Sequence, residues 1–204
     1  MKKLFFTLLT VSAFAITSHA QTVDMKINPI GILFGQYGLD ADILLQEGQS
    51  LGIGAKFYTY EYESTSTGIG SDTVDISGRF NGAVANASYR FYTNSLKASN
   101  FEGFFAAPYG KFTTRTMNGV YQENGESKGA ATLNNLAVGG LIGTKKVWRT
   151  GFLFEFNVGA GYKILNTTAY DSAKTEEEVG QEFDTLAGII PIDFRLALSI
   201  GYRF

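Results

Sequence analysis

The feature that most constrains this chain is the alternation of side chains over its last fourteen residues, 191–204. From Ile192 onward every second side chain is apolar: Ile192, Phe194, Leu196, Leu198, Ile200, Tyr202 and Phe204. The residues between them are small or charged, and include Asp193, Arg195 and Arg203. Successive side chains of a strand point to opposite faces, so the pattern predicts a strand with one wholly apolar face and one polar face.

The polar face of this strand indicates its surroundings. A water-soluble barrel or sandwich places the apolar face of a strand inside, whereas a barrel in a bilayer turns that face to lipid. Here charged side chains lie between small ones, which suits the narrow interior of a membrane barrel. An amphipathic strand at the end of a water-soluble domain is the alternative.

The same apolar face resembles the C-terminal signal by which outer-membrane barrels are recognised for assembly. The residues of this predicted assembly signal are Leu198, Ile200, Tyr202 and Phe204. We therefore expect the barrel-assembly machinery and outer-membrane lipid to be partners of the chain.

Residues 1–20 have the pattern of a secretory signal peptide. Lys2 and Lys3 are followed by the apolar run 4–16, which is shorter than the about 20 residues of a membrane helix. Small residues at Ser18 and Ala20 predict cleavage before Gln21. We expect residues 21–204 to form one outer-membrane β-barrel domain.

Composition excludes several kinds of chemistry. The one His is His19, and the chain has no Cys. Residues 21–204 therefore cannot form a Ser-His-Asp triad, a Cys-His pair or a His-ligated metal site. The 17 Lys and Arg include Lys2 and Lys3, and none of the 19 Asp and Glu precedes residue 21, so the remainder carries a net charge of −4. We predict no enzyme activity, no cofactor, no metal and no nucleic-acid partner.

Eight segments carry the strand pattern, and no apolar run after residue 20 is long enough for a membrane helix. The predicted strands are 23–34, 39–46, 51–63, 76–92, 101–116, 131–145, 152–165 and 191–204. The register of the fifth stays open, because Phe104-Phe105 breaks the alternation and Pro108 cannot donate to a ladder. The even number predicts an all-β fold, an eight-stranded antiparallel up-and-down transmembrane β-barrel.

The connections between these strands differ in length. Those after the third, fifth and seventh strands are long and polar, which predicts that they lie outside the cell. Loops 64–74, 118–129 and 168–187 are therefore the candidate surface for a ligand, and we expect the barrel to be a monomer.

Charges of both signs gather on the inward faces. Asp24, Lys145 and Arg203 lie there, together with the predicted lumen charge network of Lys26, Asp40, Asp42, Lys56, Arg90, Glu155, Lys163, Asp193 and Arg195. Eight strands leave an interior just wide enough for side chains, and buried charges must be paired. The pattern favours a side-chain-filled polar lumen, and a narrow channel is the alternative.

Two further functions remain open from the sequence. A secreted lipocalin-like binder of small ligands would reverse the inside and the outside of every clearly alternating strand. A lipid-modifying barrel enzyme is the other; small barrels of that kind depend on His, which residues 21–204 lack.

Three short stretches carry a resemblance to a known family. They are Lys26-Ile-Asn28-Pro, Gly38-Leu-Asp-Ala-Asp42 and Tyr89-Arg-Phe-Tyr92. With them the chain resembles a family of small eight-stranded outer-membrane β-barrels of uncharacterised function that is common in Bacteroidota. Phe91 stands where Tyr is commoner in that family, and Asp42 where Glu is commoner. The resemblance implies the fold and the location but no activity, so the predicted role is structural or surface interaction through the extracellular loops.

Overall fold

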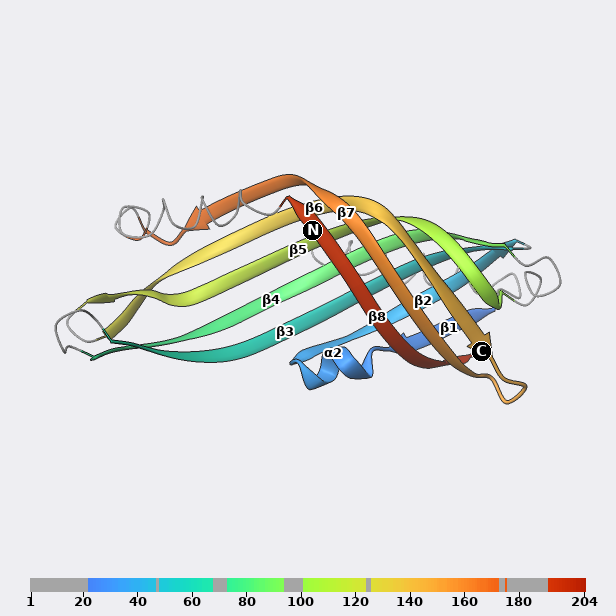
Figure 1. Cartoon of the computed structure of the whole chain (residues 1–204), viewed down its shortest axis with the longest axis horizontal. Coiled ribbons are helices and arrows are strands. Elements are labelled where there is room, and N and C mark those ends of the chain that lie inside the picture. Colours follow the sequence, from blue (N-terminus) through green and yellow to red (C-terminus); the bar gives the residue numbers. More distant parts are fainter. Residues whose placement is uncertain are drawn as a thin grey trace, which may run out of the picture.

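The computed structural model describes residues 22–46, 48–67, 73–93, 101–123, 126–172, 175 and 191–204. Eight antiparallel strands form a closed barrel in which each strand pairs with its neighbours in sequence and β1 pairs with β8 (Figure 1). The strands are β1 Val23–Ile27, β2 Gln36–Gln46, β3 Gln49–Thr67, β4 Thr73–Tyr92, β5 Gly103–Glu123, β6 Glu126–Val147, β7 Phe152–Tyr170 and β8 Ile192–Arg203. The predicted eight-stranded antiparallel barrel is confirmed. The predicted signal peptide, residues 1–20, lies outside the described residues.

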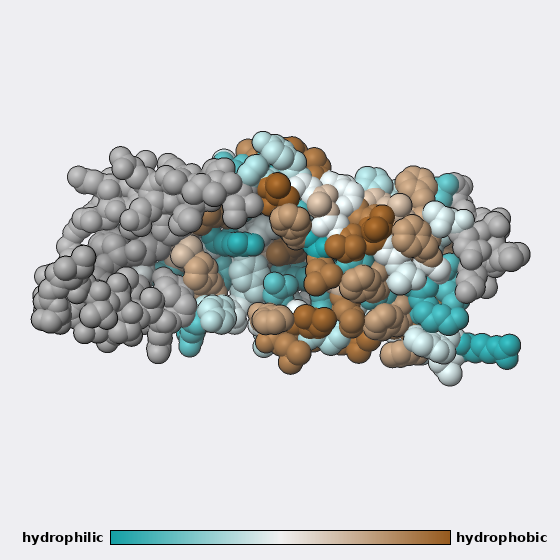
Figure 2. Space-filling model, in the orientation of Figure 1, coloured by the Kyte–Doolittle hydropathy of each residue, from teal (hydrophilic) through white to brown (hydrophobic). Residues whose placement is uncertain are grey.

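The two faces of the wall differ as the alternation predicts. On β7, Phe156 and Val158 are 40% and 43% exposed, whereas Glu155 and Asn157 between and beside them are 1% exposed. Figure 2 shows hydrophobic residues gathered over the middle of the barrel. This arrangement, apolar outside and polar inside, is the reverse of a water-soluble lipocalin barrel.

The first strand is shorter than predicted. Strand β1 ends at Ile27, and residues Pro29–Leu33 form a short helix, α2, between β1 and β2 (Figure 1). The Asn28 side chain accepts a hydrogen bond from the Gly31 N–H at 2.9 Å, and Pro29 opens the helix. An Asn cap followed by Pro favours a helix start, so the predicted strand 23–34 is wrong beyond residue 27.

Six strands are longer than predicted. Strand β2 begins at Gln36 rather than at residue 39. Strands β3 to β7 have 19 to 22 residues, whereas about 9–11 suffice to cross a bilayer. The predicted loops 64–74, 118–129 and 168–187 are therefore partly strand, because β3 continues to Thr67, β5 to Glu123 and β7 to Tyr170. In Figure 1 these strands extend well past β8 and α2 at the left, so one side of the wall is taller than the other.

The fifth strand has a continuous inward face. Phe105 and Tyr109 are buried, while Phe104 and Pro108 point outward. Pairing with β4 is interrupted between Ser88↔Tyr109 and Phe91↔Ala106, beside Pro108. Proline lacks the N–H that the ladder would need there. This register directs Lys111 into the barrel.

In the described part of the chain, no helix has the length and the apolar character needed to span a bilayer.

Candidate functional site

A cluster of seven charged side chains lies inside the barrel near the end where β1 begins and β8 ends, called here the terminal end. Four are cations and three are carboxylates. The members of this charged cluster are Asp24, Lys26, Asp42, Arg90, Lys145, Glu155 and Arg203. Every side chain except that of Arg203 is at most 3% exposed.

Two carboxylates join the cluster across the lumen. One oxygen of Asp42, Oδ2, accepts from Lys26 Nζ at 2.7 Å, from Arg90 at 2.6 Å and from Lys145 Nζ at 2.5 Å. Glu155 Oε2 accepts from Lys26 Nζ and from Arg90, both at 2.7 Å. These bonds connect β1, β2, β4, β6 and β7, so charges from five strands meet across the lumen at the terminal end.

The third carboxylate, Asp24, links β1 to β8, the two strands that close the barrel. Asp24 on β1 accepts from Arg203 Nε on β8 at 2.6 Å and from Arg203 Nη2 at 2.8 Å. Lys145 Nζ also donates to Asp24, at 2.9 Å. A guanidinium that engages both oxygens of a carboxylate forms a directional pair, so this contact fixes β1 against β8.

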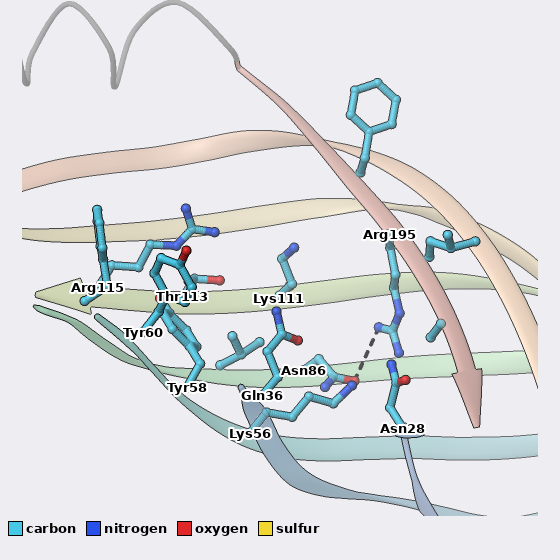
Figure 3. A pocket seen from close by; sticks show the side chains of 15 residues that line it. Asn28, Gln36, Lys56, Tyr58, Tyr60, Asn86, Lys111, Thr113, Arg115 and Arg195 are labelled. Carbon is cyan, nitrogen blue, oxygen red and sulfur yellow. Dashed lines mark hydrogen bonds between the residues drawn. The ribbon is translucent and has the colours of Figure 1, made fainter. Parts of the chain in front are cut away.

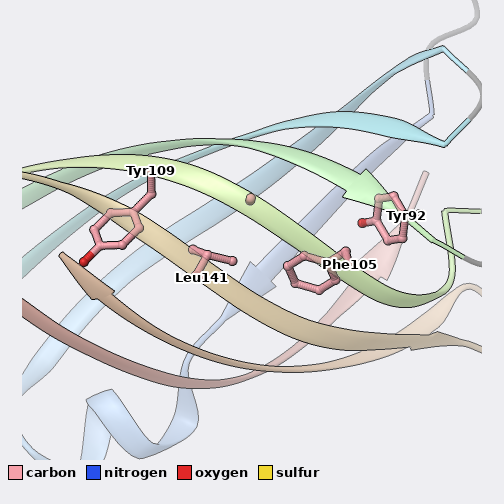
Figure 4. Close-up of a cluster of buried hydrophobic side chains, with 5 residues drawn as sticks. Tyr92, Phe105, Tyr109 and Leu141 are labelled. Carbon is pink, nitrogen blue, oxygen red and sulfur yellow. The ribbon is translucent and has the colours of Figure 1, made fainter.

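Aromatic rings fill the lumen beside the cations. The Arg90 guanidinium lies 4.8 Å from the centroid of the Phe105 ring, and Lys145 Nζ lies 5.5 Å from that of Tyr92. Figure 4 shows these two rings with Tyr109 and Leu141 along β4, β5 and β6. Cations over ring faces gain electrostatic attraction, so the rings both pack the interior and support its charges.

Between the cluster and the opposite, far end of the barrel lies a cavity of about 440 Å³ (Figure 3). Its wall is a mixture of polar, aromatic and aliphatic side chains. They are Asn28, Gln36, Lys56, Tyr58, Tyr60, Phe80, Val84, Asn86, Lys111, Thr113, Arg115, Phe194, Arg195, Leu196 and Ala197.

Two of the four cations of this cavity are ion-paired. Lys56 Nζ lies 3.1 Å from Asp40, and Lys111 pairs with Asp193. Asp193 also accepts from the Tyr109 hydroxyl at 2.7 Å.

The other two cations, Arg195 and Arg115, form no ion pair with the described residues. Arg195 donates to Asn86 at 3.3 Å, shown as the dashed line in Figure 3, and lies 5.8 Å from the Tyr109 ring centroid. The Arg115 guanidinium lies 6.0 Å from the ring centroid of Tyr58. Counted over the described residues, the cavity therefore holds two guanidinium groups in excess of its carboxylates.

A glycine makes room for one of the cavity ion pairs. A Cβ on Gly54 would lie 1.9 Å from Asp40 Oδ1 and 2.6 Å from Asn86 Nδ2. A side chain at this position would displace Asp40 from Lys56. Gly54 is therefore a requirement of the polar interior.

The predicted lumen residues fall into two groups and one separate position. Lys26, Asp42, Arg90 and Glu155 belong to the charged cluster. Asp40, Lys56, Asp193 and Arg195 lie at the cavity. Lys163 lies on the inward side of β7 at Ala137, eight residues beyond Glu155 or about 26 Å along the strand.

The structure brings Asp24, Lys145 and Arg203 into the cluster, and Lys111 into the cavity. The first three lie on the inward faces that the alternation identifies. Sequence alternation could have predicted the inward position of Lys111. Once Phe105 is assigned to the inward face of β5, Tyr109, Lys111 and Thr113 follow on the same face.

The residues of the predicted assembly signal share the outer face of β8. Tyr202 and Phe204 are exposed, with ring centroids 5.1 Å apart, and Leu198 and Ile200 are half-buried. The Phe204 N–H also donates to the Val23 carbonyl at 2.9 Å, so this residue takes part in closing the ring.

Within the described residues, no three His, Cys, Asp or Glu side chains are grouped so that they could hold a metal ion.

Comparison with solved structures relates the chain to outer-membrane barrels. It is similar to a major outer membrane protein from Thermus thermophilus, with 13% identity and a TM-score of 0.53, over 90% of this chain and 99% of that one. It also matches CarO2 of Acinetobacter baumannii, with 11% identity and a TM-score of 0.41, over 90% and 97% of the two chains. The first likeness supports the fold, and no curated protein matches the chain.

The sequence itself also matches a protein family along almost its whole length. The match covers residues 4–204, and the family is described as a protein of unknown function, DUF3575. The chain belongs to the DUF3575 family.

Proposed function

We propose that this protein is an outer-membrane barrel that does not conduct, and that its role is structural or is surface interaction at the far end of the barrel. An apolar exterior around a polar interior supports the membrane location, because only lipid favours that orientation. The likeness in fold to an outer-membrane protein agrees with it.

The observation that carries the closed lumen is the charged cluster. Its ion pairs join six strands, and every member except Arg203 is almost fully buried. Eight strands enclose too little space for both these side chains and a water column. A path for ions would require breaking pairs whose members would then be left buried without a partner.

The proposed surface role is based on the length of strands β3 to β7, which exceeds one bilayer crossing. If the terminal end faces the periplasm, β3 to β7 carry the proposed interaction regions 64–74, 118–129 and 168–187 beyond the outer leaflet. The extended strand pairs β3–β4 and β5–β6 would present a stable surface to a ligand, since their backbone is paired from Ser64↔Ile76 to Thr67↔Thr73 and from Tyr121↔Lys128 to Glu123↔Glu126.

Planar-bilayer recording of the purified, reconstituted protein tests the closed lumen. We expect no steady conductance from the unmodified chain. Reproducible single-channel steps, altered in size or ion preference by Glu155→Ala, would instead favour the narrow channel.

Cell fractionation tests the location separately. We expect the protein in the outer membrane, with heat-modifiable gel mobility and with Gln21 at its N-terminus after removal of residues 1–20. A periplasmic protein whose mobility does not depend on heating would contradict the membrane proposal.

A further inference from the structure

The early end of β1 leaves an opening in the barrel wall. Strand β1 pairs with β8 only from Asp24↔Arg203 to Ile27↔Ile200. Beyond Ile27 the chain turns into α2, so residues 192–199 of β8 have a described strand partner only on the β7 side. The helix packs against β8 and β2 without forming a ladder with either.

The cavity reaches the outside through this opening. Arg195 and Ala197 point into the barrel, whereas Phe194 and Leu196 point outward and are 74% and 68% exposed. All four line the same cavity. A cavity that touches both faces of one strand must pass around its edge, and the edge of β8 without a strand partner is the one beside α2.

The surroundings of the opening are apolar at membrane depth. Phe194 and Leu196 belong to the outward apolar row of β8, a strand of 12 residues that is about the length of one bilayer crossing. On the other side, Leu33 and Phe34 of the α2 region are 83% and 74% exposed. The opening therefore faces lipid, while the cavity behind it is polar.

Arg195, one of the two guanidinium groups in excess, lies at the inner end of the opening. Arg195 stands on the β8 edge itself, with Lys111 and Lys56 on the facing strands (Figure 3). Asp40 and Asp193 form ion pairs with the two lysines, and among the described residues no carboxylate lies within ion-pair distance of Arg195 or Arg115. Guanidinium groups match carboxylate and phosphate oxygens in geometry and charge. A volume of about 440 Å³ is in the range of small-molecule sites.

We propose that the cavity binds the anionic head group of a membrane amphiphile, which enters sideways between β8 and α2. The apolar chain of the ligand remains at the opening, against Phe194 and Leu196, and the head group reaches Arg195. This inference rests on the proposed membrane location but not on the lack of conductance.

Calorimetric titration of the full chain in dodecyl maltoside tests the ligand class, with octyl phosphate, inorganic phosphate and octyl glucoside as probes. We expect octyl phosphate to bind at least about ten-fold more tightly than inorganic phosphate, because burial of its chain adds to the affinity. Octyl glucoside, which lacks the charge, should not bind measurably. Equal affinities for octyl and inorganic phosphate would overturn the amphiphile and leave a site for free anions.

Substitution of the arginines tests the site. Arg195→Gln should weaken octyl phosphate binding at least about ten-fold, as expected for loss of a charge-assisted pair, and Arg195→Lys should restore part of it. The matched control is Arg79→Gln, which removes an exposed guanidinium paired with Glu61 outside the cavity. If Arg195→Gln does not fold, as judged by heat-modifiable mobility, Arg195→Lys tests the same position, with an affinity expected below that of the unmodified protein. Unchanged affinity in the folded arginine variants would overturn the site.

A bulky residue at the opening tests the route. Gln36 lies at the start of β2 and lines the cavity. Gln36→Trp should weaken octyl phosphate binding while leaving the weak binding of inorganic phosphate unchanged, because only the chained ligand occupies the opening. An equal loss for both probes would contradict sideways entry. Fractionation of the unmodified protein tests the membrane location independently. If the unmodified protein does not reach the outer membrane, the proposed location is wrong.

Discussion

Glu155 and Asp42 are the residues on which the interior of the barrel most depends. Each carboxylate engages at least two cations at 2.5–2.7 Å, in a region from which solvent is excluded. Taking charges out of water is costly, and mutual pairing offsets that cost only while every member is present. The loss of one carboxylate therefore leaves a buried excess of positive charge.

The first prediction concerns Glu155→Ala. Removing this carboxylate deprives Lys26 and Arg90 of one partner each, so we expect the free energy of unfolding to fall by about 3–5 kcal/mol. Urea unfolding of the protein in lipid vesicles, followed by gel mobility, measures the change. The matched control is Glu61→Ala, whose carboxylate pairs with Arg79 on the exposed wall and should cost only about 0–1 kcal/mol. Similar losses for the two variants would show that the cluster does not stabilise the barrel.

At the scale of single elements, alternation predicts which face of a strand is buried but not always where the strand ends. The inward and outward residues of β7 and β8 follow from the sequence because lipid requires an unbroken apolar face. Strands β3 to β7 were predicted too short because beyond the lipid both faces can be polar, and the alternation in hydropathy disappears.

The opening beside α2 could not be predicted from periodicity. Residues 28–34 contain enough apolar positions to pass as a continued strand, and the Asn28-Pro29 cap was the one local signal against it. The position of Lys111 likewise depended on whether Phe104 or Phe105 points inward. That choice is made by packing, since Phe105 lies beneath the Arg90 guanidinium.

The second prediction tests which face of the wall meets lipid. Phe156→Arg places a charge on the outer face of β7, where an arginine near the bilayer midplane costs roughly 2–4 kcal/mol. Val84→Glu places a charge of the opposite sign on the wall of the cavity, where two guanidinium groups are in excess, and should cost less. Unfolding in vesicles provides both values. A larger loss for the cavity variant would mean that the outer face does not contact lipid.

The third prediction concerns the end of β8. Deleting Phe204 removes the last ring of the outer apolar face and the hydrogen bond to the Val23 carbonyl, so we expect less protein in the outer membrane and more protease-sensitive chain in the periplasm. Phe204→Tyr keeps the backbone and an aromatic ring, and should assemble normally. Phe204→Ala separates the two roles, because it retains the backbone bond without the ring. Normal assembly of the deletion would count against the assembly signal.

For the whole molecule, the fourth prediction is that the tall side of the wall is not needed for insertion. Asn118 of β5 and Ala130 of β6 are directly paired. Replacing residues 119–129 by Asn-Gly would join them through a two-residue hairpin turn, which suits such a pair. We expect the shortened protein to reach the outer membrane and to retain heat-modifiable mobility, because enough paired residues remain to cross the bilayer. Loss of the heat-modifiable form would show that the extension stabilises the barrel.

The short seam between β1 and β8 has a consequence for the order in which the ring is made. Asp24 and Arg203 meet across it although 179 positions separate them in sequence, whereas every other seam joins strands that follow one another. Neighbouring strands can pair as local hairpins. Pairing of β1 with β8, in contrast, brings together residues from the two ends of the described chain and carries a larger loop-closure entropy cost. We therefore expect closure to be the last and slowest step. Until it occurs, β1 and β8 each present an unpaired edge that can capture a strand of another chain.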